Sequence, residues 1–216
     1  MRYVFSLLLG CLPSLGMACG APVCLVDPDS LALTQVITFD DIQSGAGPGY
    51  YVDDVLVLKG ASFGERFAGQ IVAARGSFDE IVGPALSPLR MVAGENGQNL
   101  SVVHFSGNTV LNGYGIEGFP RRGAQGEGAI AVLFDVDQSA FAFDMRGGEE
   151  GMALVTLHRR DGSLIGQVPV QPTGEFAVAF LRSDGSADIA GFIVTNTDPQ
   201  GLAFDTLRFG KPPELS

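Results

Sequence analysis

The sequence predicts an all-β protein with the architecture of a jelly-roll-like β-sandwich. Short runs rich in β-branched and aromatic residues recur along the 216-residue chain, with turn residues roughly every eight to twelve positions. Gly (30) and Pro (12) are spread between these runs as turn and loop residues. No stretch has a long helical period, and the pieces within 64–83 would form one short helix at most. These features favour a sandwich of about ten short antiparallel strands.

The expected strands are denser in the second half of the chain. They are QVITFD (35–40), DVLVLKG (54–60), NLSVVHF (99–105), GAIAVLFD (128–135), SAFAFDM (139–145), MALVTLHR (152–159), SLIGQVPV (163–170), EFAVAFLR (175–182), DIAGFIVTN (188–196) and LAFDTLRF (202–209). Asp161-Gly162 and Asp184-Gly185 are strong hairpin signals. The Gly-rich segments 41–53, 84–98 and 107–127 are expected to be long loops in the first half of the domain.

Residues 1–18 have the pattern of a secretory signal peptide. Arg2 precedes an apolar run, and Gly16-Met17-Ala18 ends with small residues where a signal peptidase cleaves. The run is too short and too interrupted to predict a membrane span. We therefore expect an exported protein, periplasmic or extracellular. Cleavage after Ala18 removes Arg2 and takes the formal charge from −11 to −12.

The expected mature chain has an N-terminal segment (19–34), one sandwich domain (35–210) and a tail (211–216). Cys19 and Cys24, five residues apart, predict a small local disulfide in an exported protein. The alternative is a lipoprotein acylated at Cys19, which would leave Cys24 as a free thiol. Gly16 stands where lipoprotein sites usually carry Leu, and this favours the disulfide.

Charge and motifs exclude several functions. With 24 acidic and 13 basic residues, the chain lacks the basic surface that nucleic acid requires, although it is compatible with divalent cations. GYGIEG (113–118) is followed by Phe119-Pro120 where a nucleotide-binding motif needs a helix. DVDQSAFAFDMR (135–146) begins like an EF-hand loop but lacks its Gly and its bidentate Glu.

Catalytic patterns are equally sparse. Both histidines, His104 and His158, fall inside expected strands and neither lies on a loop, which argues against a Ser-His-Asp site. Glycosidase chemistry needs two carboxyl groups about 5–10 Å apart. The sequence contains many acids but nominates no pair.

The dipeptide Phe-Asp occurs five times, at 39–40, 78–79, 134–135, 143–144 and 204–205, where 15 Phe and an equal number of Asp predict about one by chance. One interpretation is that Asp marks strand ends and accepts backbone N–H bonds. The other is calcium binding by hard carboxylate ligands.

Asp205 would share one face of its strand with Ala203 and Leu207, and a carboxylate on an apolar face needs a partner. The first and last strands of sandwich folds often pair, which would bring Asp40 and Asp41 near Asp205. These three residues are our candidate ligands for a structural Ca²⁺ ion.

Two segments, GEGAIAVLFDVDQSAFAFDMRGGEEGMALVTLHRRDGSLIG (126–166) and ADIAGFIVTNTDPQGLAFDTLRFG (187–210), resemble exported proteobacterial β-sandwich proteins often found with PEP-CTERM sorting signals. The resemblance covers roughly 35–210. Those proteins share an early F-D, a strand that begins with G-x-G and ends with F-D, a D-G hairpin and an I-x-G-x-x-x-x-N-x-D-x-x-G-x-x-x-D-x-x-x-F ending. This chain ends in KPPELS without the sorting signal, so anchoring by that route is not expected.

The resemblance implies a jelly-roll domain of the kind used in carbohydrate-binding modules, with metal stabilisation as an option. Sugar-binding faces usually use exposed aromatic rings, and the chain has no Trp. Tyr50, Tyr51 and Tyr114, all in expected loops, are therefore the candidate ligand-binding residues, with covering of the core edge as the alternative for Tyr50 and Tyr51.

The predicted function is a non-enzymatic exported module that binds carbohydrate or extracellular matrix material. The alternative is a polysaccharide lyase or hydrolase on the same scaffold, and a third reading is a purely structural surface-layer or matrix component. An enzyme requires a groove with convergent acids, Arg, Tyr or His of perturbed pKa. A binding module would instead show a shallow face with aromatic rings.

Overall fold

The computed structural model describes residues 19, 22–105 and 107–210, which form an all-β protein of eighteen strands, β1 to β18, with two short 3-10 turns. The sequence-based prediction of an all-β sandwich is confirmed, and its jelly-roll connectivity stays a prediction. The expected signal peptide (1–18) and tail (211–216) lie outside the described residues. Within the described part, no helix has the length and apolarity needed to cross a bilayer.

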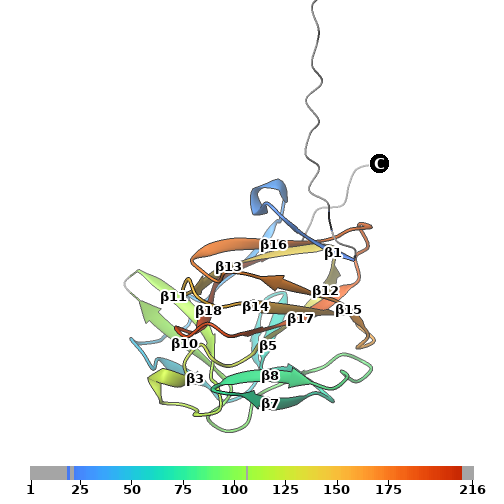
Figure 1. Ribbon diagram of the computed structural model, residues 1–216. Coiled ribbons are helices and arrows are strands. Elements are labelled where there is room, and N and C mark those ends of the chain that lie inside the picture. Colours follow the sequence, from blue (N-terminus) through green and yellow to red (C-terminus); the bar gives the residue numbers. More distant parts are fainter. Residues whose placement is uncertain (1–18, 20–21, 106, 211–216) are drawn as a thin grey trace, which may run out of the picture.

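Two antiparallel sheets form the sandwich, and Figure 1 shows them as stacked layers. Sheet A has the order β1 (Val23–Val26), β16 (Phe176–Arg182), β13 (Ala140–Gly147), β18 (Leu202–Phe209), β11 (Asn108–Gly113), β10 (Leu100–Phe105) and β3 (Tyr50–Val52), and β2 (Gln35–Thr38) also pairs with β18. Sheet B has the order β15 (Leu164–Val170), β14 (Ala153–His158), β17 (Ile189–Asn196), β12 (Ile130–Gln138), β5 (Ala61–Gly64) and β4 (Leu56–Leu58).

The sandwich core consists of the inward-facing side chains of both sheets and is rich in phenylalanine. Phe141 and Phe192 stack with ring centroids 4.2 Å apart, and Phe143 and Phe204 stack at 4.3 Å. All four rings are completely buried. Aromatic pairs in this geometry add roughly 0.5–1.5 kcal/mol each beyond the burial of their area. This core joins sheet A to sheet B.

A third layer, which we call the cover (residues 65–92), lies on the outer face of sheet B (Figure 1). Its strands are β6 (Arg66–Phe67) paired with β9 (Met91–Val92), and the hairpin of β7 (Ile71–Arg75) with β8 (Phe78–Val82). A small second core joins the cover to the sheet; it comprises Phe67, Leu89, Ala129, Ala131, Ala190 and Ile193.

Every one of the ten expected strands is present, but the structure contains eight more. In the range 64–83, where the sequence allowed one short helix at most, the structure has the strands β5 to β8. The segment 19–34, which we had separated from the sandwich, contributes β1 to the edge of sheet A.

The Asp184-Gly185 turn is also different from the expected hairpin. Gly185 has the positive φ of a tight turn, but the turn carries the chain from β16 in sheet A to β17 in sheet B. Asp161-Gly162 does close a hairpin, between β14 and β15.

Candidate functional site

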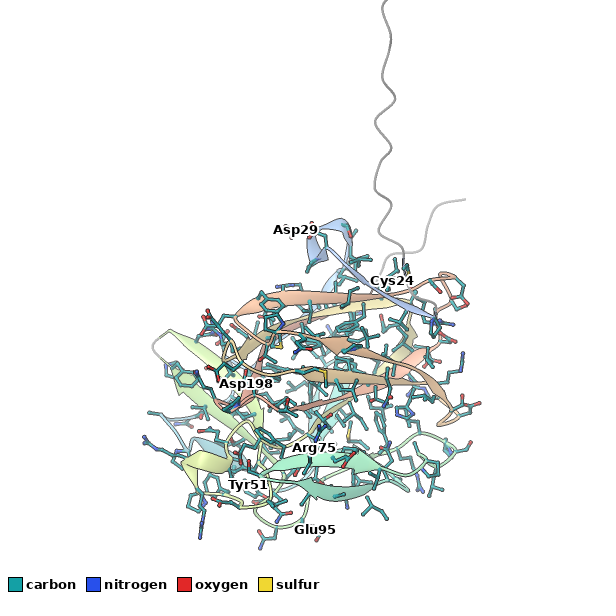
Figure 2. The ribbon with its side chains drawn as sticks, viewed as in Figure 1. Cys24, Asp29, Tyr51, Arg75, Glu95 and Asp198 are labelled. Atoms are coloured by element: carbon teal, nitrogen blue, oxygen red, sulfur yellow. A yellow bond between two sulfur atoms is a disulfide. The ribbon has the colours of Figure 1, made fainter. Side chains whose placement is uncertain are left out.

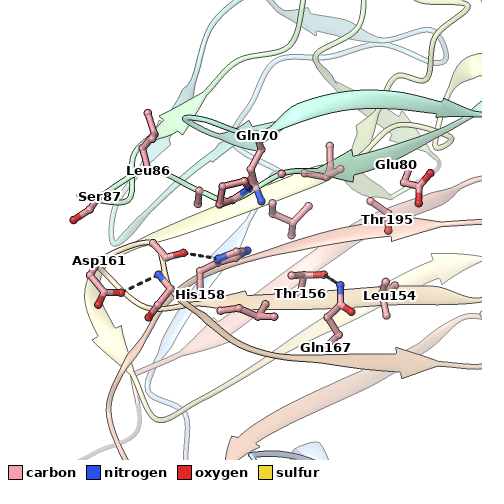
Figure 3. Close-up of a pocket in the computed structure, with 18 residues that line it drawn as sticks. Gln70, Glu80, Leu86, Ser87, Leu154, Thr156, His158, Asp161, Gln167 and Thr195 are labelled. Carbon is pink, nitrogen blue, oxygen red and sulfur yellow. Dashed lines mark hydrogen bonds between the residues drawn. The ribbon is translucent and has the colours of Figure 1, made fainter.

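A hollow with a volume of about 600 Å³ lies between the cover and the outer face of sheet B (Figure 3). Its walls come from the β7–β8 hairpin and the loop after it on one side, and from β14, β15 and β17 on the other. It is lined by Gln70, Glu80, Ile81, Gly83, Pro84, Ala85, Leu86, Ser87, Leu154, Thr156, His158, Asp161, Gly162, Ser163, Leu164, Gln167, Ile193 and Thr195.

Strand alternation decides which side chains reach this pocket. Along β14, Ala153, Val155 and Leu157 point into the sandwich core, so the intervening Leu154, Thr156 and His158 point outward into the pocket. Figure 3 shows Thr156 bonded to the neighbouring Gln167, whose Nε2 donates to Thr156 Oγ1 at 3.2 Å. One face of the sheet therefore presents a row of hydroxyl and amide groups.

Gly162 allows the cover to approach the sheet. Its φ of +84° is a left-handed conformation that side chains rarely adopt. A Cβ at this position would also lie 2.8 Å from the carbonyl oxygen of Leu86. The β14–β15 turn thus fits directly against the loop that forms one wall of the pocket.

His158 is the most unusual polar group of the pocket, with only 4% of its surface exposed. Its Nδ1 lies 3.2 Å from the carbonyl oxygen of Gly162, which can only accept, so Nδ1 carries the proton. Nε2 is then an acceptor, and it is buried without a hydrogen-bond partner. Burial lowers the pKa of the imidazole below its ordinary value, against the weaker effect of the Gly162 bond, and this favours the neutral ring.

The charged groups of the pocket are two carboxylates, Glu80 and Asp161. Asp161 Oδ1 accepts the Ser163 N–H at 2.9 Å, and the hydrogen bonds from Ser163 lower the pKa of Asp161, so it stays ionised at neutral pH. None of the described lining residues is Lys or Arg. The pocket is therefore suited to neutral or cationic ligands rather than to anions.

The cover also contains two buried acids, Glu65 and Asp79. Glu65 and Asp79 are 1% and 4% exposed. Burial, followed by the nearby Asp79 charge, raises the pKa of Glu65 to about 7, with Arg66 opposing. Burial raises the pKa of Asp79 to about 6, although its Oδ2 accepts the Ala129 N–H at 2.9 Å. Burial likewise raises the pKa of the neighbouring Glu127.

The predicted pairing of 37–41 with 201–209 is confirmed, with Ile37 of β2 opposite Leu207 of β18. Asp40 Oδ1 accepts the Thr109 N–H at 3.1 Å, and Asp205 Oδ2 accepts the Asn108 amide at 2.6 Å, so both acids reach the start of β11. Asp41 is exposed on the following turn.

The cation beside Asp205 in this structure is Arg146, whose Nε and Nη2 both lie 3.0 Å from Oδ2. Within 19, 22–105 and 107–210, no group of three or more His, Cys, Asp or Glu side chains is arranged to hold a metal ion. Calcium at Asp40, Asp41 and Asp205 stays a prediction.

An irregularity in the pairing of β13 with β18 explains why the carboxylate of Asp205 does not lie in the apolar core. Opposite Phe143 and Met145 of β13 stand Leu207 and Phe204 of β18, so β18 carries one extra residue at this point. This β-bulge interrupts the alternation, and Phe204 and Leu207 both enter the core. Asp205 consequently lies outside the core. The assumption that it shares a face with Leu207 was wrong.

The three candidate tyrosines do not form one platform. Tyr114 is completely buried and packs edge-on against Phe119 at 5.5 Å, so it cannot offer an exposed ring. Figure 2 shows Tyr51 in the lower part of the molecule, where it belongs to β3. Its hydroxyl accepts the Gly97 N–H at 2.7 Å. Only Tyr50 is freely exposed, at 52%. Tyr51 is thus a packing residue, in agreement with the alternative interpretation for it, and Tyr114 is a buried packing residue that the sequence did not indicate.

The predicted local disulfide is present, joining Cys19 to Cys24 at the start of β1 with Cα atoms 4.9 Å apart.

The pocket itself was not predicted. Its residues come from 70–87, 154–167 and 193–195, far apart in sequence. The usable signal was a histidine three residues before an Asp-Gly turn. No family model matches the chain, and the comparison with curated proteins finds no match either.

Proposed function

We propose that this protein is an exported, non-enzymatic binding module that holds part of a polysaccharide or matrix glycan in the pocket between the cover and sheet B. The observation that carries the proposal is the pocket lining, in which amide and hydroxyl groups alternate with aliphatic side chains. Gln70, Gln167, Thr156 and Thr195 supply the polar groups. Sugars present hydroxyl groups beside apolar C–H faces and so match such a surface.

The size of the pocket supports the same conclusion. Small-molecule sites commonly have volumes of roughly 300–1,000 Å³ and combine an apolar lining with a few placed polar groups. The 600 Å³ hollow fits that range. It would take one or a few sugar units, with the rest of a glycan chain outside.

The test is a glycan array on residues 19–216, followed by calorimetric titration of the oligosaccharides that bind. Gln167→Ala removes one polar group of the pocket and should weaken binding about 2- to 10-fold, the usual range for one hydrogen bond. Gln43→Ala, an exposed glutamine in the loop before β3, is the matched control and should change nothing. Equal affinities of the two variants would place the ligand elsewhere.

The alternative is a polysaccharide lyase or hydrolase, and one observation favours it. His158 with its lowered pKa and the carboxylates of Glu80 and Asp161 line the same pocket, where a general base and an acid are needed. Incubation of the protein with the glycans that bind distinguishes the two functions. New reducing ends or unsaturated products would establish an enzyme, and an unchanged glycan after long incubation supports the binding module.

Export and the relationship to sandwich proteins with PEP-CTERM signals are also part of the proposal. The disulfide supports an oxidising compartment. Mass spectrometry of the secreted protein should show cleavage after Ala18 and no titratable thiol before reduction. An acylated Cys19 with a free Cys24 would favour the lipoprotein route.

A further inference from the structure

His158 Nε2 is a hydrogen-bond acceptor without a partner, so a ligand that binds beside it should donate a hydrogen bond. The inference rests on the function proposed above and concerns the kind of glycan that is bound. His158 Nε2 belongs to a side chain that is more than nine-tenths buried, lines the pocket and has no partner for this atom. A buried polar group without a hydrogen-bond partner destabilises the protein. A ligand group that donates a hydrogen bond here removes this destabilisation.

The orientation of the ring is held from two sides. The Gly162 carbonyl accepts from Nδ1, and the Phe67 ring packs edge-on against the imidazole with centroids 5.4 Å apart. Phe67 is itself anchored, because its backbone N–H donates to Gln70 Oε1 at 3.0 Å. The imidazole therefore cannot turn Nε2 toward another protein partner without breaking these contacts.

We propose that His158 Nε2 accepts a hydrogen bond from a hydroxyl group of an uncharged sugar, and that the pocket selects neutral glycans against uronate-containing ones. His158 acts here as a specificity-determining residue.

The charges that line the pocket explain why it would select neutral glycans against uronate-containing ones. Glu80 on the hairpin and Asp161 on the β14–β15 turn are the titratable groups that line the pocket with His158, and both are acids. A uronate carboxylate would meet two like charges and no Lys or Arg among the described lining residues. It also cannot donate to Nε2, because an ionised carboxylate only accepts. A neutral sugar suffers neither penalty.

The probes are hexasaccharides of two classes. Cello-, manno-, xylo- and chitohexaose are neutral, and oligomannuronate and oligogalacturonate are anionic. Calorimetric titration should show binding of at least one neutral hexaose and at least tenfold weaker binding of both uronates. His158→Phe removes the acceptor but keeps a ring against Phe67, and should weaken binding of the neutral ligand about 5- to 150-fold. His158→Gln keeps an acceptor oxygen and should recover part of this loss. His104→Phe, at the exposed histidine of β10, is the control and should bind like wild type.

The outcomes separate this inference from the function it rests on. Equal binding of the neutral ligand by wild type and a folded His158→Phe variant overturns the role of His158, while the binding function stands. Stronger binding of a uronate overturns the selection for neutral sugars. Absence of binding by every probe and on the array removes both. If His158→Phe fails to fold, the Nε2 chemical shift of wild-type His158 decides: it moves on adding the neutral hexaose if the bond forms, and an unchanged shift in a saturated complex refutes it.

Discussion

The sandwich core and the second core under the cover differ in the types of residue that they bury. The sandwich core buries stacked phenylalanines and aliphatic side chains. The cover buries a smaller apolar cluster beside two acids, Glu65 and Asp79. Buried ionisable groups make stability depend on protonation, whereas apolar packing does not. We therefore expect the stability of the two-sheet sandwich to be independent of pH, while deprotonation of Glu65 and Asp79 loosens the cover, which forms one wall of the proposed binding pocket.

The largest expected effect is on the sandwich core. Phe192→Ala removes a ring that stacks on Phe141 and contacts Phe134, and should lower the free energy of unfolding by about 3–5 kcal/mol. Urea unfolding followed by circular dichroism measures the loss. A change below about 1 kcal/mol would show that the phenylalanine cluster is not the main stabilising element.

The matching change in the cover is Phe67→Ala. Phe67 is equally buried, but the cluster it belongs to is small, so we expect a smaller global loss than for Phe192→Ala. Opening should instead be local, with amide exchange in 65–92 at least about tenfold faster. Equal acceleration throughout both sheets would mean that cover and sandwich unfold as one unit.

The next largest expected effect is the pH dependence of stability that arises from Glu65 and Asp79 in the cover. The pKa values of Glu65 (about 7) and Asp79 (about 6) in the folded protein exceed their ordinary values of 4.5 and 3.8. The folded state therefore binds more protons than the unfolded state between these values, and stability falls as pH rises from about 4 to about 7. We expect a loss on the order of 1–3 kcal/mol between pH 5 and pH 8 from this pair.

Unfolding curves at several pH values measure this dependence. Glu65→Gln combined with Asp79→Asn should flatten it, while Glu149→Gln, at an exposed glutamate, should leave it as in wild type. An unchanged slope in the double variant would assign the pH dependence to other groups.

The smallest expected effect concerns calcium at Asp205. Because Arg146 already neutralises this carboxylate, Ca²⁺ should raise the wild-type melting temperature only slightly, and more in Arg146→Gln. Thermal melts with Ca²⁺ and with chelator provide the measurement. Identical midpoints in both conditions for both proteins would remove calcium from the account.

The sequence predicted the sandwich better than it predicted the cover, for a physical reason. The ten expected strands have alternating or continuous apolar runs that reflect burial on one or both faces. The segment 108–113 (NTVLNG) has weak strand propensity and becomes β11 because β10 and β18 flank it in sheet A. The strands of the cover are short and partly polar, so their pairing depends on contacts between distant segments.

The candidate site was also hard to predict, because its geometry depends on contacts between segments that are distant in the sequence. The sequence predicted the pairing of β2 with β18, and Asp40 and Asp205 both bond to residues at the start of β11. A bulge in β18 determines which face Asp205 takes, and no pattern in the sequence predicted that bulge. Tyr114 looked like a loop residue and is buried by the chain that folds over it. The pocket residues meet only when 70–87 fold back onto β14 and β17.

Hydrogen exchange with and without a bound neutral hexaose tests the central claim most directly. If the pocket between the cover and sheet B is the binding site, saturating ligand slows exchange of backbone amides in 79–87 and 154–167, and leaves 140–147 in sheet A unchanged. Protection confined to Tyr50 and Tyr51, or to the outer face of sheet A, would contradict the account and move the site away from His158.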